Sequence, residues 1–190
     1  MIFIKRGAVQ ITINQKDYRA ESGTLILIGA LEQHELKIIS RPYERYFCIF
    51  PPQLLEQPNW NPLLATAFKN RPYHFSHCLT LKQPDRVEKM MRTMGEEYDH
   101  RLPLAEEMTA TFLEQLLIHV YREHPEQFFL PDTENAEKVW EVQRYLESHF
   151  SEPVFISDLA AAHFISTDYL GKIFKEMTGY TPKQYLMEYR

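Results

Sequence analysis

Apolar and polar residues alternate along the first fifty positions of the chain. Val9, Ile11 and Ile13 are separated by single polar residues, and this period of two is typical of a strand with one buried face. The polar residues 14–17 predict a turn after this strand. Further strands are predicted at 24–28, 34–39 and 43–50. Short strands separated by turn residues predict a β-sandwich or β-barrel.

A helical period replaces this alternation at Asp85. Before it, residues 51–84 are punctuated by prolines, and only Leu54-Leu55 and Leu63-Leu64 indicate short helices. Two apolar stripes then follow, one over Val87, Met90, Met91, Met94 and Tyr98, and one after Pro103 over Met108, Phe112, Leu116, Leu117, Val120 and Tyr121. Two amphipathic helices with a short connection predict an antiparallel pair.

The last segment, residues 136–190, is helical throughout and follows a polar linker predicted at 131–135. Its first helix carries an apolar stripe at Val139, Val142, Leu146 and Phe150. A last helix is predicted to begin at Thr181-Pro182-Lys183-Gln184, where Thr is the cap, Pro the first helical residue and Gln the capping-box residue.

Two short helices between these predict a helix-turn-helix. Ser157 is the expected N-cap of a helix over 158–164, and Ser166 is the expected N-cap of a helix over 167–177 that ends at Gly179. The small residues Ala160, Ala161 and Ala162 favour close packing of the two helices. The second helix has a polar face that carries Thr167, Asp168, Gly171, Lys172 and Lys175. Such pairs occur both as DNA readers and as plain structural elements, so the spacing alone leaves both open.

Composition narrows the class of protein. The 190 residues have ordinary globular proportions and a formal net charge of −5, so any DNA contact has to be local. Residues 139–190 hold five Lys/Arg and seven Asp/Glu, which argues against an autonomous DNA binder. Two cysteines indicate no disulfide framework. We find neither a signal peptide nor a run of about 18 apolar residues, so a cytoplasmic protein without membrane contact is expected.

The C-terminal motif resembles the AraC/XylS family of transcription regulators. The resemblance rests on the run Ser-x-x-Tyr-Leu-x-x-x-Phe-Lys-x-x-x-Gly at 166–179, on 156–160 before it, and on Tyr180-Thr181-Pro182, Tyr185-Leu186 and Arg190 after it. In that family this run forms the first of two helix-turn-helix units. The resemblance implies base-reading positions at Asp168, Gly171 and Lys172, and phosphate contacts near Ser166, Thr167 and Lys175, on double-stranded DNA.

The N-terminal half resembles the same family's cupin-like sensor arm at 3–7, 23–28 and His34. The resemblance implies an α+β chain with a cupin-like β-barrel or sandwich for effector binding at 1–84, a helical dimerisation segment at 85–130 and a partial DNA-binding domain at 136–190. A homodimer through 85–124 and a small effector, such as a sugar or another polar metabolite, are expected. Because the family's second helix-turn-helix does not follow, a truncated chain is also expected. The candidate effector residues are Ile11, Ile13, His34, Tyr46 and Cys48.

Two other classes of protein stay open. A cupin-type metal enzyme with a helical interaction tail needs about three histidines and a carboxylate in the barrel, but residues 1–33 contain no histidine. His74, His77 and Cys78 form an isolated His-x-x-His-Cys cluster without a second ligand pair nearby. We therefore expect no metal, no cofactor and no catalytic residues. The other alternative is a dimerising fragment that does not bind DNA.

Overall fold

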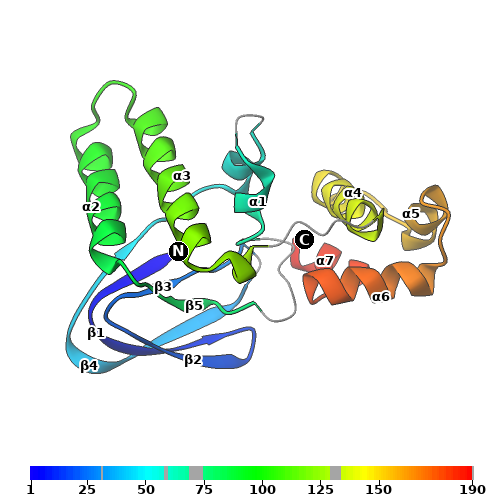
Figure 1. Ribbon diagram of the computed structural model, residues 1–190. Coiled ribbons are helices and arrows are strands. Elements are labelled where there is room, and N and C mark those ends of the chain that lie inside the picture. The colour runs from blue at the N-terminus through cyan, green and yellow to red at the C-terminus, as the bar shows by residue number, and fades with distance from the viewer. Residues whose placement is uncertain (31, 58–59, 69–74, 129–133, 190) are drawn as a thin grey trace. The chain divides into compact units, whose positions relative to one another are not determined.

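The protein is a mixed α+β chain, as predicted. The computed structural model describes residues 1–30, 32–57, 60–68, 75–128 and 134–189. The described residues form two compact units: residues 1–68 with 75–128 form the first, and residues 134–189 form the second. The first unit is a curled antiparallel sheet with helices against it, and the second unit is helical (Figure 1).

The sheet of the first unit is built around one long strand. Its strands are β1 (Ile2–Ile13), β2 (Lys16–Glu21), β3 (Thr24–Ile26), β4 (His34–Phe47) and β5 (Cys78–Thr80). β1 pairs with β2 and β3 on one side and with β4 on the other, and β5 pairs with β3. Asn14 and Gln15, both with positive φ, form the two-residue hairpin turn between β1 and β2, which suits the twist of the strands that it joins.

β1 changes the face that it buries halfway along. Ile2 and Ile4 pack into the same apolar cluster as Val9, Ile11 and Ile13, so the buried positions switch from even to odd numbers. Strict alternation does not allow this switch, and the β1–β4 register shifts between Ile4 and Val9. Gly7 lies within this irregular stretch with φ +88°, a conformation that glycine adopts without steric cost.

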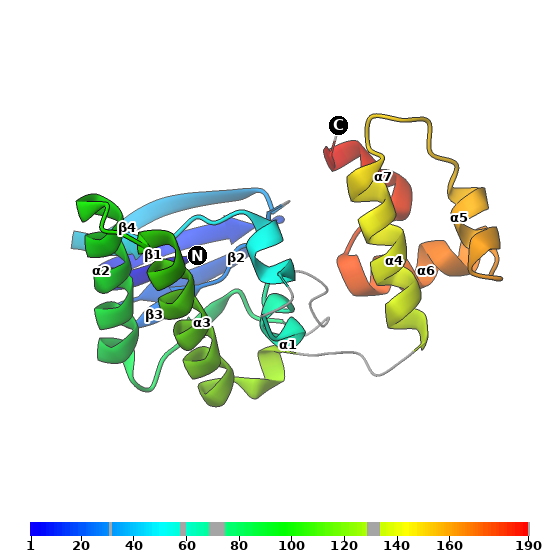
Figure 2. The same cartoon turned by 90° about the horizontal axis from the view of Figure 1, so that it is seen from above.

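Two helices cover one face of the sheet (Figure 2). α2 (Pro84–His100) and α3 (Ala105–Glu123) lie side by side and antiparallel (Figure 1). Their apolar stripes meet Met1, Phe3, Leu25 and Leu27 in the larger core cluster. The short helices η1 (Pro52–Glu56) and α1 (Pro62–Ala65) contribute Leu55 and Leu64 to this cluster. The sheet therefore has one face that α2 and α3 cover. Its opposite face, called the inner face below, carries the aliphatic cluster that includes Val9, Ile11 and Ile13.

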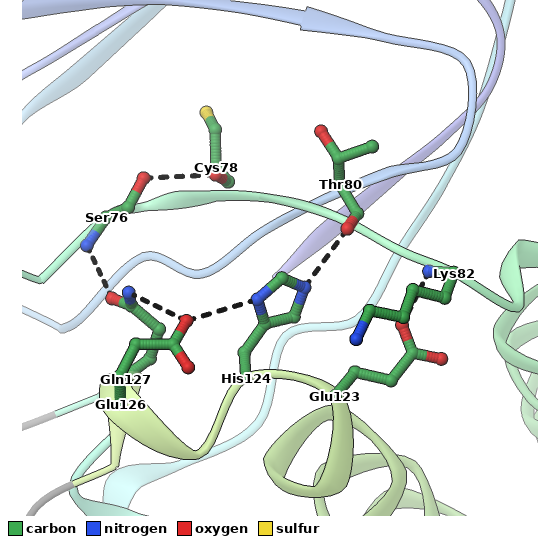
Figure 3. A network of polar contacts seen from close by, with 8 residues as sticks. All are labelled: Ser76, Cys78, Thr80, Lys82, Glu123, His124, Glu126 and Gln127. Atoms are coloured by element: carbon green, nitrogen blue, oxygen red, sulfur yellow. Dashed lines mark hydrogen bonds and ion pairs between the residues drawn. The ribbon is translucent and has the colours of Figure 1, made fainter.

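Side chains from the end of α3 and from η2 (Pro125–Gln127) line the outer edge of β5 (Figure 3). Gln127 Oε1 accepts from the backbone N–H of Ser76 at 2.7 Å, and His124 Nε2 lies 3.0 Å from the carbonyl oxygen of Thr80. The Glu123 carboxylate accepts from the backbone N–H groups of Lys82 (2.6 Å) and Gln83 (3.2 Å). Side chains thus satisfy backbone groups within β5 and in the segments on either side of it.

In its described residues, 134–189, the second unit has four helices: α4 (Glu134–Ser148), α5 (Ile156–Ala162), α6 (Thr167–Thr178) and α7 (Pro182–Tyr189). Its core combines Val139, Val142 and Leu146 of α4 with apolar residues of the other three helices, namely Leu159, Ala160, Leu170, Ile173, Phe174, Tyr185 and Leu186. The capping box at Thr181 forms as predicted, since the Gln184 N–H bonds to Thr181 Oγ1 at 3.3 Å and the Thr181 N–H bonds to Gln184 Oε1 at 2.9 Å.

Several predicted details are wrong. The segments 34–39 and 43–50 are not two strands, because β4 continues through Arg41-Pro42 as one strand of 14 residues. β5 was not predicted, since three residues are too few to show a period. Ser157 is not an N-cap: α5 begins at Ile156, and the Ser157 hydroxyl bonds instead to Asp158. Residues 131–133 of the predicted linker lie outside the described residues.

Candidate DNA-binding and effector sites

The turn between α5 and α6 has the hydrogen bonds of a Schellman motif. The Phe164 N–H bonds to the carbonyl oxygen of Ala161, and the Ile165 N–H bonds to that of Ala160, both at 3.0 Å. Phe164 is the left-handed residue of the motif, with φ +57°. Ser166 then caps α6, because its side-chain oxygen accepts from the backbone N–H of Tyr169 at 3.1 Å. The two helices are therefore joined through a defined turn.

α6 separates an apolar face from a polar face. Leu170, Ile173 and Phe174 are buried, whereas five of the six predicted DNA-contacting residues are exposed: Ser166, Thr167, Asp168, Lys172 and Lys175. The sixth residue, Gly171, is half-buried, and a Cβ added to it would meet nothing within 4 Å. All six predicted positions thus come together on one accessible side of α6 and its N-cap.

The close packing expected from three alanines involves one of them. Ala160 is 1% exposed, whereas Ala161 and Ala162 are exposed. α5 has only seven residues, so a single small side chain is enough at the point where the two helices approach each other. The alanine run as a whole is therefore not the packing contact that was expected, because only Ala160 is buried.

A buried hydrogen-bond network holds α7 against α4. Tyr185 donates its hydroxyl proton to Glu147 Oε1 at 2.6 Å and accepts from Gln143 Nε2 at 3.4 Å. The Tyr185 ring also meets Phe174 of α6 edge to face, with ring centroids 5.4 Å apart. At the other end of α4, Asn135 Nδ2 donates to the Tyr169 hydroxyl at 3.0 Å. These contacts fix the orientation of α6 within the unit.

The five predicted effector residues do not line one surface. Ile11 and Ile13 are fully buried on the inner face of the sheet, whereas Tyr46 and Cys48 pack against the core cluster under the helices. His34 is exposed at the start of β4, opposite Ile13. Ile11, Ile13 and His34 therefore lie on one side of the sheet, and Tyr46 and Cys48 lie on the other.

A polar network that sequence reasoning missed lies beside this inner face. Tyr18 is the cross-strand partner of Ile11 and packs against the aliphatic cluster. A hydrogen bond of 2.8 Å joins the Tyr18 hydroxyl to His77 Nδ1, and Nε2 of the same ring lies 2.7 Å from Glu32 Oε1. The other Glu32 oxygen accepts from the Gly29 N–H at 2.6 Å. The only sequence signal was the isolated His-x-x-His-Cys cluster, of which His74 lies outside the described residues.

The described part of the first unit also has a hollow and two half-buried cysteines. A shallow, open hollow between Gly7, Arg19, Glu21 and Ser40 contains none of the predicted effector residues. Burial raises the pKa of the Cys78 thiol to about 11 and also raises that of Cys48. Within the described part of the chain, no three His, Cys, Asp or Glu side chains gather as a metal site. None of the described helices is long and apolar enough to cross a membrane.

Comparison with known proteins finds curated relatives along the whole chain. The uncharacterised HTH-type transcriptional regulator YisR of Bacillus subtilis is 27% identical over 203 residues, which cover 97% of this chain and 67% of YisR. The HTH-type transcriptional activators RhaR of Salmonella strains are 22–23% identical and are matched over 100% of this chain and 67% of their own length. The chain thus spans about two thirds of the length of these relatives. No protein-family model matches.

Among solved structures, ToxT of Vibrio cholerae is similar over nearly the whole chain. Apo ToxT is 10% identical, with a TM-score of 0.40, over 100% of this chain and 88% of its own. ToxT bound to a methylnaphthalenyl butenoic acid is 12% identical with a TM-score of 0.39. These scores are too low to carry an argument about fold or function.

Proposed function

We propose that the chain is an HTH-type transcriptional regulator of the AraC/XylS family, in line with the HTH-type regulators that it resembles along its length, and that α6 is its recognition helix for duplex DNA. The observation that carries the proposal is that α6 has one buried and one exposed face. Its three large apolar residues are buried, and the five side chains of the predicted contact set are exposed. A recognition helix needs an apolar face to hold it in place and a free polar face for the major groove.

Each contact residue has a distinct role in this proposal. Lys172 donates to base edges, where guanine O6 and N7 are the usual acceptors of a lysine. Asp168 accepts from cytosine N4, and Gly171 leaves room for the backbone of α6 to approach the bases. Ser166, Thr167 and Lys175 bind phosphates, helped at the N-terminus by the helix dipole.

The first unit is proposed to regulate this DNA binding. A small effector, of which a sugar is the class that the family resemblance suggests, binds against the inner face of the sheet near Ile11, Ile13 and His34. Tyr46 and Cys48 contribute only through the core behind that sheet. The Tyr18–His77–Glu32 network supplies hydrogen-bonding groups beside this face. Effector binding changes DNA affinity by linkage between the two sites.

The proposal includes a cytoplasmic homodimer, acting as a regulator and not as an enzyme. Dimerisation through residues 85–124 is supported by exposed large apolar side chains around the α2–α3 connection, namely Tyr98, Leu102, Leu104 and Met108. Exposed apolar patches of this kind mark interaction surfaces. Sedimentation that depends on protein concentration, and that Leu104→Glu abolishes, would support the dimer; a monomer at every concentration would refute it.

The DNA proposal is tested by selecting duplexes from a randomised pool with the chain, at low and at physiological salt. Lys172→Ala should weaken binding to the selected sequence by about 5- to 100-fold and relax its selectivity. Lys175→Ala should weaken binding to all DNA sequences alike. It should also lower the slope of the logarithm of the binding constant against the logarithm of the salt concentration by about 0.9.

Lys183→Ala is the matched control, since it removes an equally exposed lysine from α7. It should leave sequence selectivity unchanged. If the chain selects no sequence at either salt concentration, the DNA proposal fails, and a dimerising fragment without DNA binding becomes the better account.

A further inference from the structure

Among the described residues of the second unit, Phe164 is the most exposed large apolar residue. Its exposed fraction is 97%, whereas its sequence neighbour Ile165 is half-buried. An exposed phenylalanine forgoes the burial that usually stabilises a side chain of this size. Phe164 therefore contributes little apolar burial to the fold.

The backbone at Phe164 also disfavours this residue type. The left-handed position of a Schellman motif is most often glycine, because a Cβ there is close to the backbone. Phe164 occupies the position with φ +57° and with both hydrogen bonds of the motif in place. Glycine would form the same turn with less strain, so the turn does not require the aromatic ring.

The place of Phe164 in the chain points to DNA. Phe164 lies two residues before Ser166, the N-cap of α6, and two residues cannot separate their Cα atoms by more than about 7 Å. The N-terminal residues of a recognition helix are the ones that contact base edges. The ring has no charge and no polar group with which to bind a phosphate, but it can contact the C5-methyl group of thymine, a contact that phenylalanine makes in the major groove.

From these observations we infer that Phe164 contacts a thymine methyl group at the edge of the major groove and thereby adds specificity to α6. The inference rests on the proposed function, since it requires α6 to enter that groove. It adds a residue outside the contact set implied by the family resemblance. It also explains why an exposed, conformationally strained aromatic residue lies directly before the N-cap of α6.

The test measures affinity for the duplex selected from the randomised pool by the unmodified chain. Phe164→Ala should lower this affinity by roughly 3- to 10-fold, the range for losing contact with one or two methyl-sized groups. Uracil lacks the methyl group of thymine. When the thymines of the duplex are replaced by uracil one at a time, the affinity of the unmodified chain should fall at one position. At that position the Phe164→Ala variant should bind the thymine duplex and the uracil duplex equally well. The salt slope should stay unchanged, because no phosphate contact is lost.

Phe164→Gly separates binding from folding. Glycine relieves the left-handed strain, so this variant should unfold at the same or a higher temperature and yet bind the duplex 3- to 10-fold more weakly, as estimated for Phe164→Ala. Met187→Ala, which removes another exposed apolar side chain of the unit from α7, should change neither property.

Equal affinity of Phe164→Ala and the unmodified chain would overturn the inference and leave the recognition role of α6 intact. If Phe164→Ala binds more weakly but still loses affinity at the uracil position that weakens the unmodified chain, the thymine contact is overturned. If the unmodified chain selects no duplex, the proposed function fails, and the inference fails with it.

Discussion

The side-chain oxygen of Ser166 accepts a hydrogen bond from the backbone N–H of Tyr169 across 3.1 Å. A serine hydroxyl can accept one hydrogen bond and donate another at the same time. The Ser166 O–H therefore remains able to donate to a DNA phosphate while its oxygen caps α6. One residue thus has a folding role and a proposed binding role, which different substitutions can separate.

Ser166→Ala should destabilise the second unit by about 1 kcal/mol, the usual cost of losing an N-cap, and should weaken DNA binding. Ser166→Asp should keep the cap, since aspartate is an equally good N-cap residue, and yet weaken DNA binding because its charge repels phosphate.

The chain has two tryptophans, Trp60 in the first unit and Trp140 in the second. Urea unfolding followed by Trp140 fluorescence in a Trp60→Phe background measures the second unit. Equal midpoints for Ser166→Ala and its parent would contradict the capping role.

Substitution by alanine should lower the stability of the protein at Gly7 and raise it at Gly171. A Cβ on Gly7 would lie 2.6 Å from the carbonyl oxygen of Pro42, and φ is +88°, so Gly7→Ala should cost about 2 kcal/mol or more in the first unit. A Cβ on Gly171 meets nothing within 4 Å. Gly171→Ala should therefore stabilise α6 by about 0.5–1 kcal/mol. Denaturant unfolding of both variants checks the pair, and a tolerated Gly7→Ala would show that β4 can shift.

Tyr185→Phe should destabilise the second unit by about 1–3 kcal/mol, because it leaves the Gln143 amide and the Glu147 carboxylate without the hydroxyl that joins them. The matched control is Tyr169→Phe, which removes a hydroxyl from an exposed hydrogen bond with Asn135. This control should change stability by no more than about 0.5 kcal/mol. Equal losses of stability in the two variants would mean that burial of the Tyr185 network does not stabilise the second unit.

Cys78 should react slowly with alkylating reagents at neutral pH. Burial raises its thiol pKa from 9.0 to about 11, and the thiolate is the reactive form. At pH 8 the folded protein should therefore react about 100-fold more slowly than the unfolded chain. A Cys48→Ser variant isolates Cys78, and iodoacetamide labelling followed by mass spectrometry gives the rate from pH 7 to 11. The rate should keep rising towards pH 11; a plateau near pH 9 would show an accessible thiol.

The second unit could be predicted because its signals are local. The Ser166 cap, the Gly179 C-cap and the Thr181–Gln184 capping box involve residues only a few positions apart, so neighbouring residue types determine them. The apolar period of α6 likewise identifies its buried face without knowledge of its partners. The conformation of Phe164 was not predicted, because Phe164 was expected as the last residue of a helix. Its left-handed conformation belongs to the turn that the folded chain adopts.

The first unit could be predicted only in outline. Alternation identified the strands, but the face that each residue takes depends on the register with neighbouring strands, and one irregular residue reverses it. The shift near Gly7 and the pairing with β4 place Ile11 and Ile13 on one side of the sheet, and Tyr46 and Cys48 pack on the other. Tyr18, Glu32 and His77 meet across as many as 59 positions of sequence. By itself the sequence determined the long helices, the caps at Ser166, Gly179 and Thr181, and the polar face of α6, because these follow from contacts within one or two turns. Only the tertiary structure decided which strand residues share a face and which distant polar groups meet, because strand pairing joins segments whose separation leaves no local period.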